Sequence, residues 1–200
     1  MNDHDDELST LAEQYRPDEP VLTEAERQAE AAMEAVRQQA MVKVDEAYRL
    51  ALQQDPAVAE LRKREWVCAE LGQIGVYEEV LLIDPNVVQA MTVDQVAYVL
   101  RHEVGHVVLN HHVRERAFRA GLTDPATLNM ATTAFNAGAD LEVNGGLLDA
   151  MVEAGLQDTG VVPGYGAFVG VPPFLTAEEY TTLILNTPEL WADIAKRAGR

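Results

Sequence analysis

Apolar residues recur at helical spacing over long stretches of this chain, and this period predicts a mostly helical protein. The longest stretch opens at a capping box of Thr23 and Glu26 and runs to about Gln54. A second stretch opens at a capping box of Thr92 and Gln95 and predicts a helix of roughly twenty residues. Further helices are expected at about 56–64, 125–154, 177–185 and 188–198.

Between Trp66 and Ile83 the pattern changes to β-branched and aromatic residues that are interrupted by Gly72 and Gly75. Such a stretch predicts two or three short strands, the last of them at Val80–Ile83. The predicted fold class is therefore α+β and mostly helical, with a small β-sheet or hairpin immediately before the second long helix.

Two parts of the chain lack this regular pattern. Residues 1–20 are acidic and interrupted by prolines, which is typical of a disordered tail, so we expect a single domain over residues 21–200. The Gly/Pro-rich segment from Gly155 to Pro173 is long enough to be a lid or a binding loop. Tyr165 within it and Tyr180 after it are candidates to stabilise an oxyanion, and simple packing of the ring is the alternative for both.

The candidate chemistry centres on His102-Glu103-Val104-Gly105-His106, inside the second long helix. Two imidazoles four positions apart lie about 40° apart around a helix axis, so both can bind one metal ion. Glu103 lies about 100° from His102 and would flank the ion, where a base can take a proton from a metal-activated water. The alternative is a helix whose two histidines only form hydrogen bonds in the core or face solvent.

A zinc site needs a third protein ligand, and Asp140 is the strongest candidate. It follows a stretch without charge, from Ala126 to Ala139, that predicts a buried helix. A buried aspartate needs a compensating partner, which is either a metal or an arginine such as Arg101. Asn136, Asp140 and Asn144 form one polar stripe at helical spacing, and this stripe indicates a lined site unless it faces solvent.

Three other residues stay open as the third ligand. His111 and His112 follow the motif, but without a turn after His106 both would point away from it and mark the solvent-facing end of the helix. Glu142 is about 200° from Asp140 around their helix, so only one of these two carboxylates can face the metal.

The stretch from Val80 to Tyr180 resembles the zincin-like metallopeptidase domain of bacteria and their phages that is often joined to a von Willebrand A-like domain. The motifs that carry the resemblance are, in order, Ile83-Asp84-Pro85, the helix Tyr98–Arg114 with its HExxH motif, Ala139-Asp140-Leu141-Glu142-Val143-Asn144 and Thr176-Ala177-Glu178-Glu179-Tyr180. Asp84 stands where the family usually has Asn, a change that conserves shape. Because no segment follows Arg200 to form the second domain, we expect a stand-alone version.

The resemblance implies a zincin-like fold in which His102, His106 and Asp140 bind zinc and Glu103 is the general base. It also implies that Val80–Ile83 is an edge strand with which an extended substrate pairs through main-chain hydrogen bonds. An ordinary strand whose edge is covered by a loop is the alternative.

Composition limits the partners. The formal net charge of −18, from 15 basic and 33 acidic residues, argues against a nucleic-acid partner because phosphates repel such a surface. Cys68 is the only cysteine, which excludes an intramolecular disulfide and a cysteine zinc cluster. The N-terminus lacks the apolar run of a signal peptide and no stretch is long enough to span a membrane, so we expect no membrane partner and a cytoplasmic protein.

These observations together predict a zinc metallopeptidase that hydrolyses a peptide or protein substrate with Zn²⁺ as its cofactor. One alternative is a non-catalytic, zinc-stabilised module that binds peptides or regulates a partner. Glu103 argues against it, because a site that only binds has no need of a base. A helical structural protein without a metal is the remaining alternative.

Overall fold

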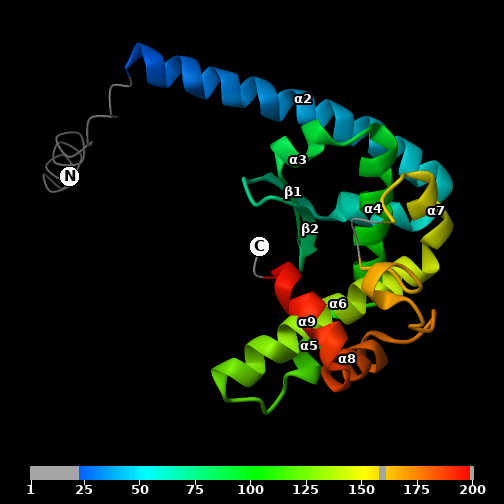
Figure 1. Ribbon diagram of the computed structural model, residues 1–200. Helices are drawn as coiled ribbons and strands as arrows, with labels where there is room; N and C mark the ends of the chain where they lie inside the picture. Colours follow the sequence, from blue (N-terminus) through cyan, green and yellow to red (C-terminus); the bar gives the residue numbers. More distant parts are fainter. Residues whose placement is uncertain (1–22, 158–160, 199–200) are drawn as a thin grey trace, which may run out of the picture. The chain divides into compact units, whose positions relative to one another are not determined.

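A computed structural model describes residues 23–157 and 161–198 of the chain (Figure 1). The chain divides into two compact units, residues 1–35 and 36–200. The predicted tail at residues 1–20 lies outside the described residues, and a single domain over residues 21–200 stays a prediction.

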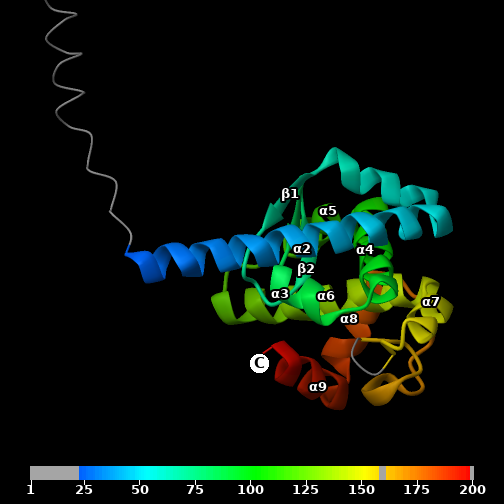
Figure 2. The ribbon, with the colours of Figure 1, turned by 90° about the horizontal axis from the view of Figure 1, so that it is seen from above.

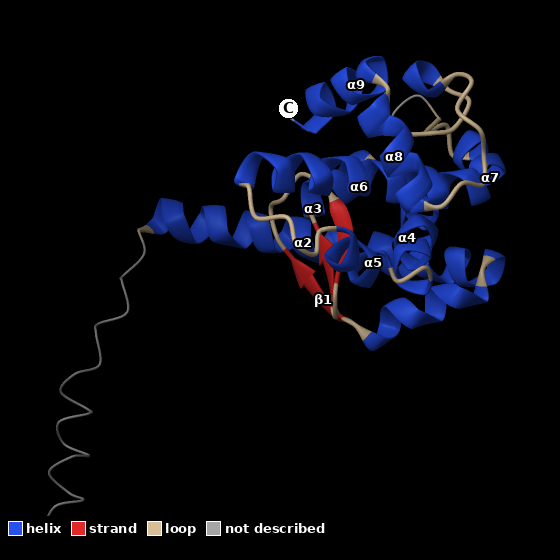
Figure 3. Cartoon of the chain, turned by 90° about the horizontal axis from the view of Figure 1, so that it is seen from below, coloured by secondary structure: helices blue, strands red, loops and turns tan. Residues whose placement is uncertain are grey.

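Helices dominate the described residues, and a small sheet is the only other regular structure among them (Figure 3). In chain order the elements are α2 (Glu24–Gln54), the 3₁₀ helix η1 (Pro56–Lys63), β1 (Glu65–Cys68), β2 (Ile74–Tyr77), β3 (Val80–Ile83), α3 (Pro85–Ala90), α4 (Val93–Val108), α5 (His111–Phe118), α6 (Pro125–Gly146), α7 (Leu148–Glu153), the 3₁₀ helix η2 (Gly166–Phe168), α8 (Ala177–Asn186) and α9 (Pro188–Ala198). The predicted α+β class and the sheet before the motif helix are confirmed, whereas the predicted fold did not include α3.

The sheet has the strand order β1-β3-β2, so β3 lies in its centre. β1 pairs with β3 in parallel, and β2 pairs with β3 in an antiparallel hairpin closed by Glu78 and Glu79. The prediction that Val80–Ile83 is an edge strand is therefore wrong, because β1 covers one side of this strand and its hairpin partner covers the other. The strand whose outer edge faces α4 is β2.

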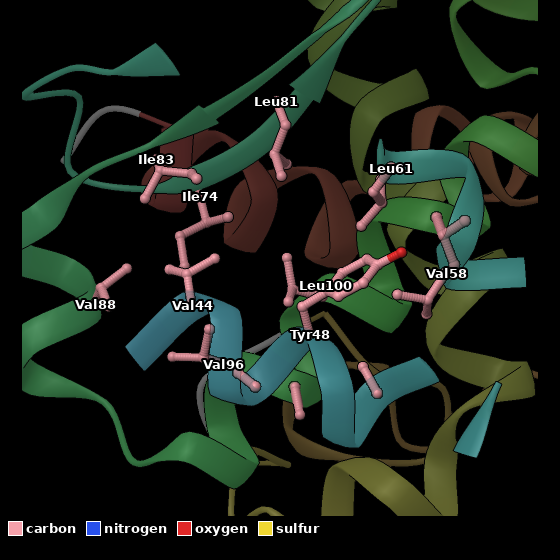
Figure 4. Packing of buried hydrophobic residues seen from close by; sticks show 14 of the residues in the cluster. Val44, Tyr48, Val58, Leu61, Ile74, Leu81, Ile83, Val88, Val96 and Leu100 are labelled. Carbon is pink, nitrogen blue, oxygen red and sulfur yellow. The ribbon is translucent and has the colours of Figure 1, made fainter. Parts of the chain in front are cut away.

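The larger apolar core lies between α2, η1, the sheet and α4 (Figure 4). From α2 it takes residues after Val36, and in Figure 2 this part of the helix passes over α3 and α4. Side chains that are fully buried here include Val44, Leu61, Leu81 and Leu100. Burying this face of α4 fixes the helix and leaves its opposite face for polar residues.

A second apolar cluster lies between α6, α8 and α9, and includes Leu141, Tyr180 and Ile184. Gly138 makes this packing possible, because a Cβ there would lie 2.5 Å from the Ala177 carbonyl oxygen of α8. The backbones of α6 and α8 thus approach each other closely, and α6 is held between α8 on one side and α4 on the other.

α4 begins as the sequence predicts and ends earlier. Thr92 and Gln95 form both hydrogen bonds of the capping box, with donor–acceptor distances of 3.0 and 3.2 Å. The helix stops at Val108, and Asn110 takes a left-handed conformation with φ of 55° before α5 starts at His111. Asparagine tolerates this conformation better than most residues, so a turn forms here without a glycine.

Candidate metal centre

Two helices bring three donor atoms together. His102 and His106 of α4 place their Nε2 atoms 2.9 Å apart, and Asp140 Oδ1 of α6 lies 3.4 Å from the first and 3.2 Å from the second. Among the residues that the structure describes, these three form a group able to hold a metal ion. Tetrahedral zinc with bonds of about 2.0–2.1 Å separates its ligands by roughly 3.3 Å, so the nitrogen and carboxylate donors fit such an ion in kind and in spacing.

The close approach of α4 and α6 depends on Gly105, in the middle of the motif. A Cβ on Gly105 would lie 2.8 Å from Cγ1 of Val143, which is buried on α6. Any larger residue at this position would push the helices apart. The glycine therefore lets Asp140 reach the two histidines.

The polar stripe on α6 does line a site. Asn136 and Asp140 face a cavity, and Asn144 is buried beside His102. Asp140 is 38% exposed through this cavity, so it is less buried than the apolar sequence around it predicts. Arg101, the alternative partner for Asp140, instead donates to Gln54 Oε1.

Asn144 orients His102. Its Oδ1 accepts hydrogen bonds from His102 Nδ1, at 2.8 Å, and from the Tyr98 hydroxyl, at 2.5 Å, while its Nδ2 donates to the Val161 carbonyl at 2.7 Å. Because its Nδ1 donates to Asn144, the Nε2 of His102 faces Asp140 and His106 and is the nitrogen left to bind a cation.

His106 is held by a second histidine. Its Nδ1 lies 2.9 Å from Nδ1 of His111, whose Nε2 lies 3.0 Å from Oε2 of Glu142. Glu142 Oε2 also accepts the Ala177 main-chain N–H at 2.7 Å and lies 3.1 Å from the Arg114 guanidinium. The prediction that His111 marks a solvent-facing helix end is wrong. The turn at Asn110 directs the His111 side chain into the protein, and the residue is only 4% exposed.

None of the three alternative ligands belongs to the donor group among the described residues. His111 contacts the nitrogen of His106 that faces away from the other two donors, and Glu142 contacts His111. His112 lines the cavity. Sequence patterns missed the roles of His111 and Glu142, because both depend on one left-handed residue.

The electrostatics couple the three donors. Burial by itself lowers the pKa of His102, but the hydrogen bond and charge of Asp140 more than offset this and raise it to about 9. Burial alone would raise the pKa of Asp140, and the hydrogen bonds to His102 and His106 instead hold it well below its usual range. Burial and the neighbouring His106 lower the pKa of His111 to about 4, so His111 is neutral at physiological pH.

Glu103 lies beside the donors and is not one of them. Its side chain is 8% exposed, and its Oε2 accepts the Val76 main-chain N–H of β2 at 2.7 Å. Burial raises the pKa of this carboxyl group, in opposition to the lowering effect of His102 and His106. A raised pKa makes this carboxylate a stronger proton acceptor than an exposed glutamate.

A cavity of about 660 Å³ opens onto these residues. Residues 73–78 of β2 and its flanking turns line one part of it, and residues of α5 and α6 line another. Neither Tyr165 nor Tyr180 is among its lining residues: Tyr165 packs near α7, and Tyr180 is fully buried and donates to the Pro172 carbonyl. The described part of the loop from Gly155 to Pro173 does not line the cavity either.

Two histidines and an aspartate around an accessible cavity, with a buried glutamate beside them, define a candidate metallohydrolase site. Comparison with protein families agrees: residues 39–158, more than half of the chain, match the family described as "Putative metallopeptidase domain". The chain therefore belongs to this family, and membership implies a metal cofactor. No curated protein and no solved structure matches the chain. Among its described residues, no helix is long and apolar enough to cross a membrane.

Proposed function

We propose that this protein is a zinc-dependent metallopeptidase in which His102, His106 and Asp140 bind the metal and Glu103 is the general base. The observation that carries the proposal is the convergence of the three donor atoms, all within 4.8 Å of one another, beside a buried carboxylate that faces the same cavity. Membership of the metallopeptidase family supports the same conclusion.

The chemistry that zinc supplies at such a site is polarisation of the scissile carbonyl and a lowered pKa, about 7, for water. Glu103 is placed to take a proton from water in the cavity while that water attacks the carbonyl carbon. It then gives the proton to the nitrogen of the leaving amine as the C–N bond breaks, so the carboxylate is regenerated. Val76 fixes the carboxylate during these transfers by its N–H.

The edge of β2 is the surface that we propose for the substrate backbone. Main-chain groups alternate sides along a strand. The Val76 N–H on the outer side is taken by Glu103, so the main-chain groups of Ile74, which share this side, are those that we propose for pairing with the substrate. Residues of β2 also line the cavity. An extended peptide that pairs with this edge would place its carbonyls beside Glu103 and the donor group. The role first assigned to Val80–Ile83 thus falls to the neighbouring strand.

The test is a pair of carboxylate variants in the same cavity. Glu103→Gln keeps the size and most hydrogen bonds of the side chain but cannot accept a proton, so peptide cleavage should fall at least about 100-fold. Glu115→Gln changes a carboxylate of α5 that lines the cavity beside Arg119, and it should stay within a few-fold of the wild type.

Cleavage is measured by mass spectrometry on a mixture of proteome-derived peptides, with and without a chelator, and zinc content is measured on each sample. Both variants should retain zinc. Normal cleavage by Glu103→Gln would contradict the assignment of the base. Retained zinc and bound peptides without cleavage by the wild-type protein would instead support a non-catalytic peptide-binding module.

A further inference from the structure

We propose that His111 is a positioning residue for the metal centre, and that with Glu142 it holds His106 in the orientation and proton arrangement that metal binding needs. This inference rests on the proposed metal site and adds to it two residues outside the three ligands. Its basis is a hydrogen-bond chain that runs from His106 through His111 to the Glu142 carboxylate of α6.

The proton positions along this hydrogen-bond chain follow from its chemistry. If Nε2 of His106 is to bind a cation, its Nδ1 must carry the proton and donate it. The nearest acceptor is Nδ1 of His111, at 2.9 Å, which is an acceptor only when the His111 proton is on Nε2. Glu142 Oε2, 3.0 Å from that Nε2, favours this arrangement because a carboxylate accepts and does not donate.

Glu142 is itself held in place. Besides His111, it accepts the N–H of Ala177 in the first turn of α8, and the Arg114 guanidinium lies beside it. Arg114 in turn is hydrogen-bonded to Glu178. Three elements therefore meet at one carboxylate oxygen: α5 through His111, α6 through Glu142 itself, and α8 through Ala177.

The local backbone and burial agree with this role. His111 is 4% exposed, and both of its ring nitrogens have polar partners, so it is a satisfied buried group. It reaches His106 only because Asn110 takes a left-handed φ of 55° between α4 and α5. Its neighbour His112 lines the cavity and serves as a matched control.

Ligand histidines are commonly oriented by an acceptor for their second N–H, and loss of that acceptor typically weakens metal binding by about 10- to 100-fold. The decisive comparison is His111→Asn with His111→Leu. The two side chains have nearly the same shape, and only asparagine places an acceptor where Nδ1 of the histidine lies. If His111 contributed packing alone, the His111→Leu variant would bind the metal at least as tightly as the His111→Asn variant.

The experiment measures Zn²⁺ affinity by competition with a chromophoric chelator, and the visible absorption of each protein loaded with Co²⁺. We expect His111→Leu to bind Zn²⁺ about 10- to 100-fold more weakly and to show an altered Co²⁺ spectrum. His111→Asn should return to within a few-fold of the wild type, and His112→Leu should match it. Thermal unfolding of the metal-free proteins checks that every variant folds.

The inference is overturned if His111→Leu binds Zn²⁺ as the wild type does, or if His111→Asn binds as weakly as His111→Leu. Either result leaves the ligand assignment intact, because the wild-type protein would still bind the metal. A wild-type protein that takes up neither Zn²⁺ nor Co²⁺ would overturn the proposed function itself, so the two failures are distinguishable.

Discussion

The two imidazoles of α4 are supported differently on the two sides of the metal centre. His102 donates directly to Asn144, a neutral amide that is also bound to Tyr98 and to the Val161 carbonyl. The second imidazole, on the other side, reaches a carboxylate through an intermediate histidine. An amide oxygen always accepts, whereas an imidazole nitrogen accepts only in one tautomer. On the His106 side, the carboxylate of Glu142 is therefore needed to fix the tautomer of the intermediate histidine and the direction of its hydrogen bonds. The His102 side needs no such charged group.

Both supports nevertheless depend on α6. This helix provides Asp140 to the donor group, Asn144 to the His102 side and Glu142 to the other side. Asp140 and Asn144 share a face at a spacing of four residues. Glu142 lies on a different face of α6. It contacts the metal centre only through His111, which the left-handed turn at Asn110 directs toward it.

Removing both supports at once should produce the largest effect. The Asn144→Leu and His111→Leu changes remove hydrogen-bond partners from different ligands, so we expect each to add to the loss in binding free energy that the other causes. Each alone should weaken Zn²⁺ binding about 10- to 100-fold, and together about 10²- to 10⁴-fold. Chelator competition on the two single variants and the double variant measures this. A double variant no weaker than either single one would show that the two sides act as one unit.

Asn144→Asp supplies the matched control for the His102 side. The carboxylate keeps an acceptor for His102 and Tyr98, but it replaces the donor to Val161 by a second acceptor in a buried site. The variant should therefore unfold more easily, while its Zn²⁺ affinity stays within a few-fold of the wild type. If the aspartate variant is as weak as Asn144→Leu, the hydrogen bond to His102 is not what Asn144 contributes.

Tyr98→Phe should have the smallest effect. It removes one of the two donors to Asn144 and leaves the bond from His102 in place. Loss of one hydrogen bond of this kind typically costs about 1 kcal/mol of unfolding free energy, and Zn²⁺ affinity should change about threefold or less. Chemical unfolding and the same competition assay measure the two quantities. A loss of affinity as large as that of Asn144→Leu would move the orienting role from the amide to the hydroxyl.

Most of the helices could be predicted because their signals are local. The capping box of Thr23 and Glu26, and that of Thr92 and Gln95, form as the sequence indicates. The convergence of Asp140 with the motif histidines was also foreseeable, since an isolated aspartate in an uncharged helix requires a partner. In each case a few neighbouring residues carry the information.

The remaining features depend on contacts that local patterns do not encode. β3 lies in the centre of the sheet because β1, more than ten residues earlier, pairs with it in parallel. His111 lies inside because Asn110 adopts a left-handed conformation, which asparagine tolerates but does not usually take. The Val76 N–H that holds Glu103 likewise comes from a strand remote in sequence.

The central claim is tested most directly by metal content in Asp140→Ala, compared with the wild type and with Asn136→Ala. Asn136 lies one turn away on the same stripe and lines the same cavity, but it is outside the donor group. After loading with Zn²⁺ and exhaustive dialysis, elemental analysis should find about one zinc per chain in the wild type and in Asn136→Ala, and little in Asp140→Ala. A wild type without zinc, or an Asp140→Ala protein with as much zinc as the wild type, would contradict the account.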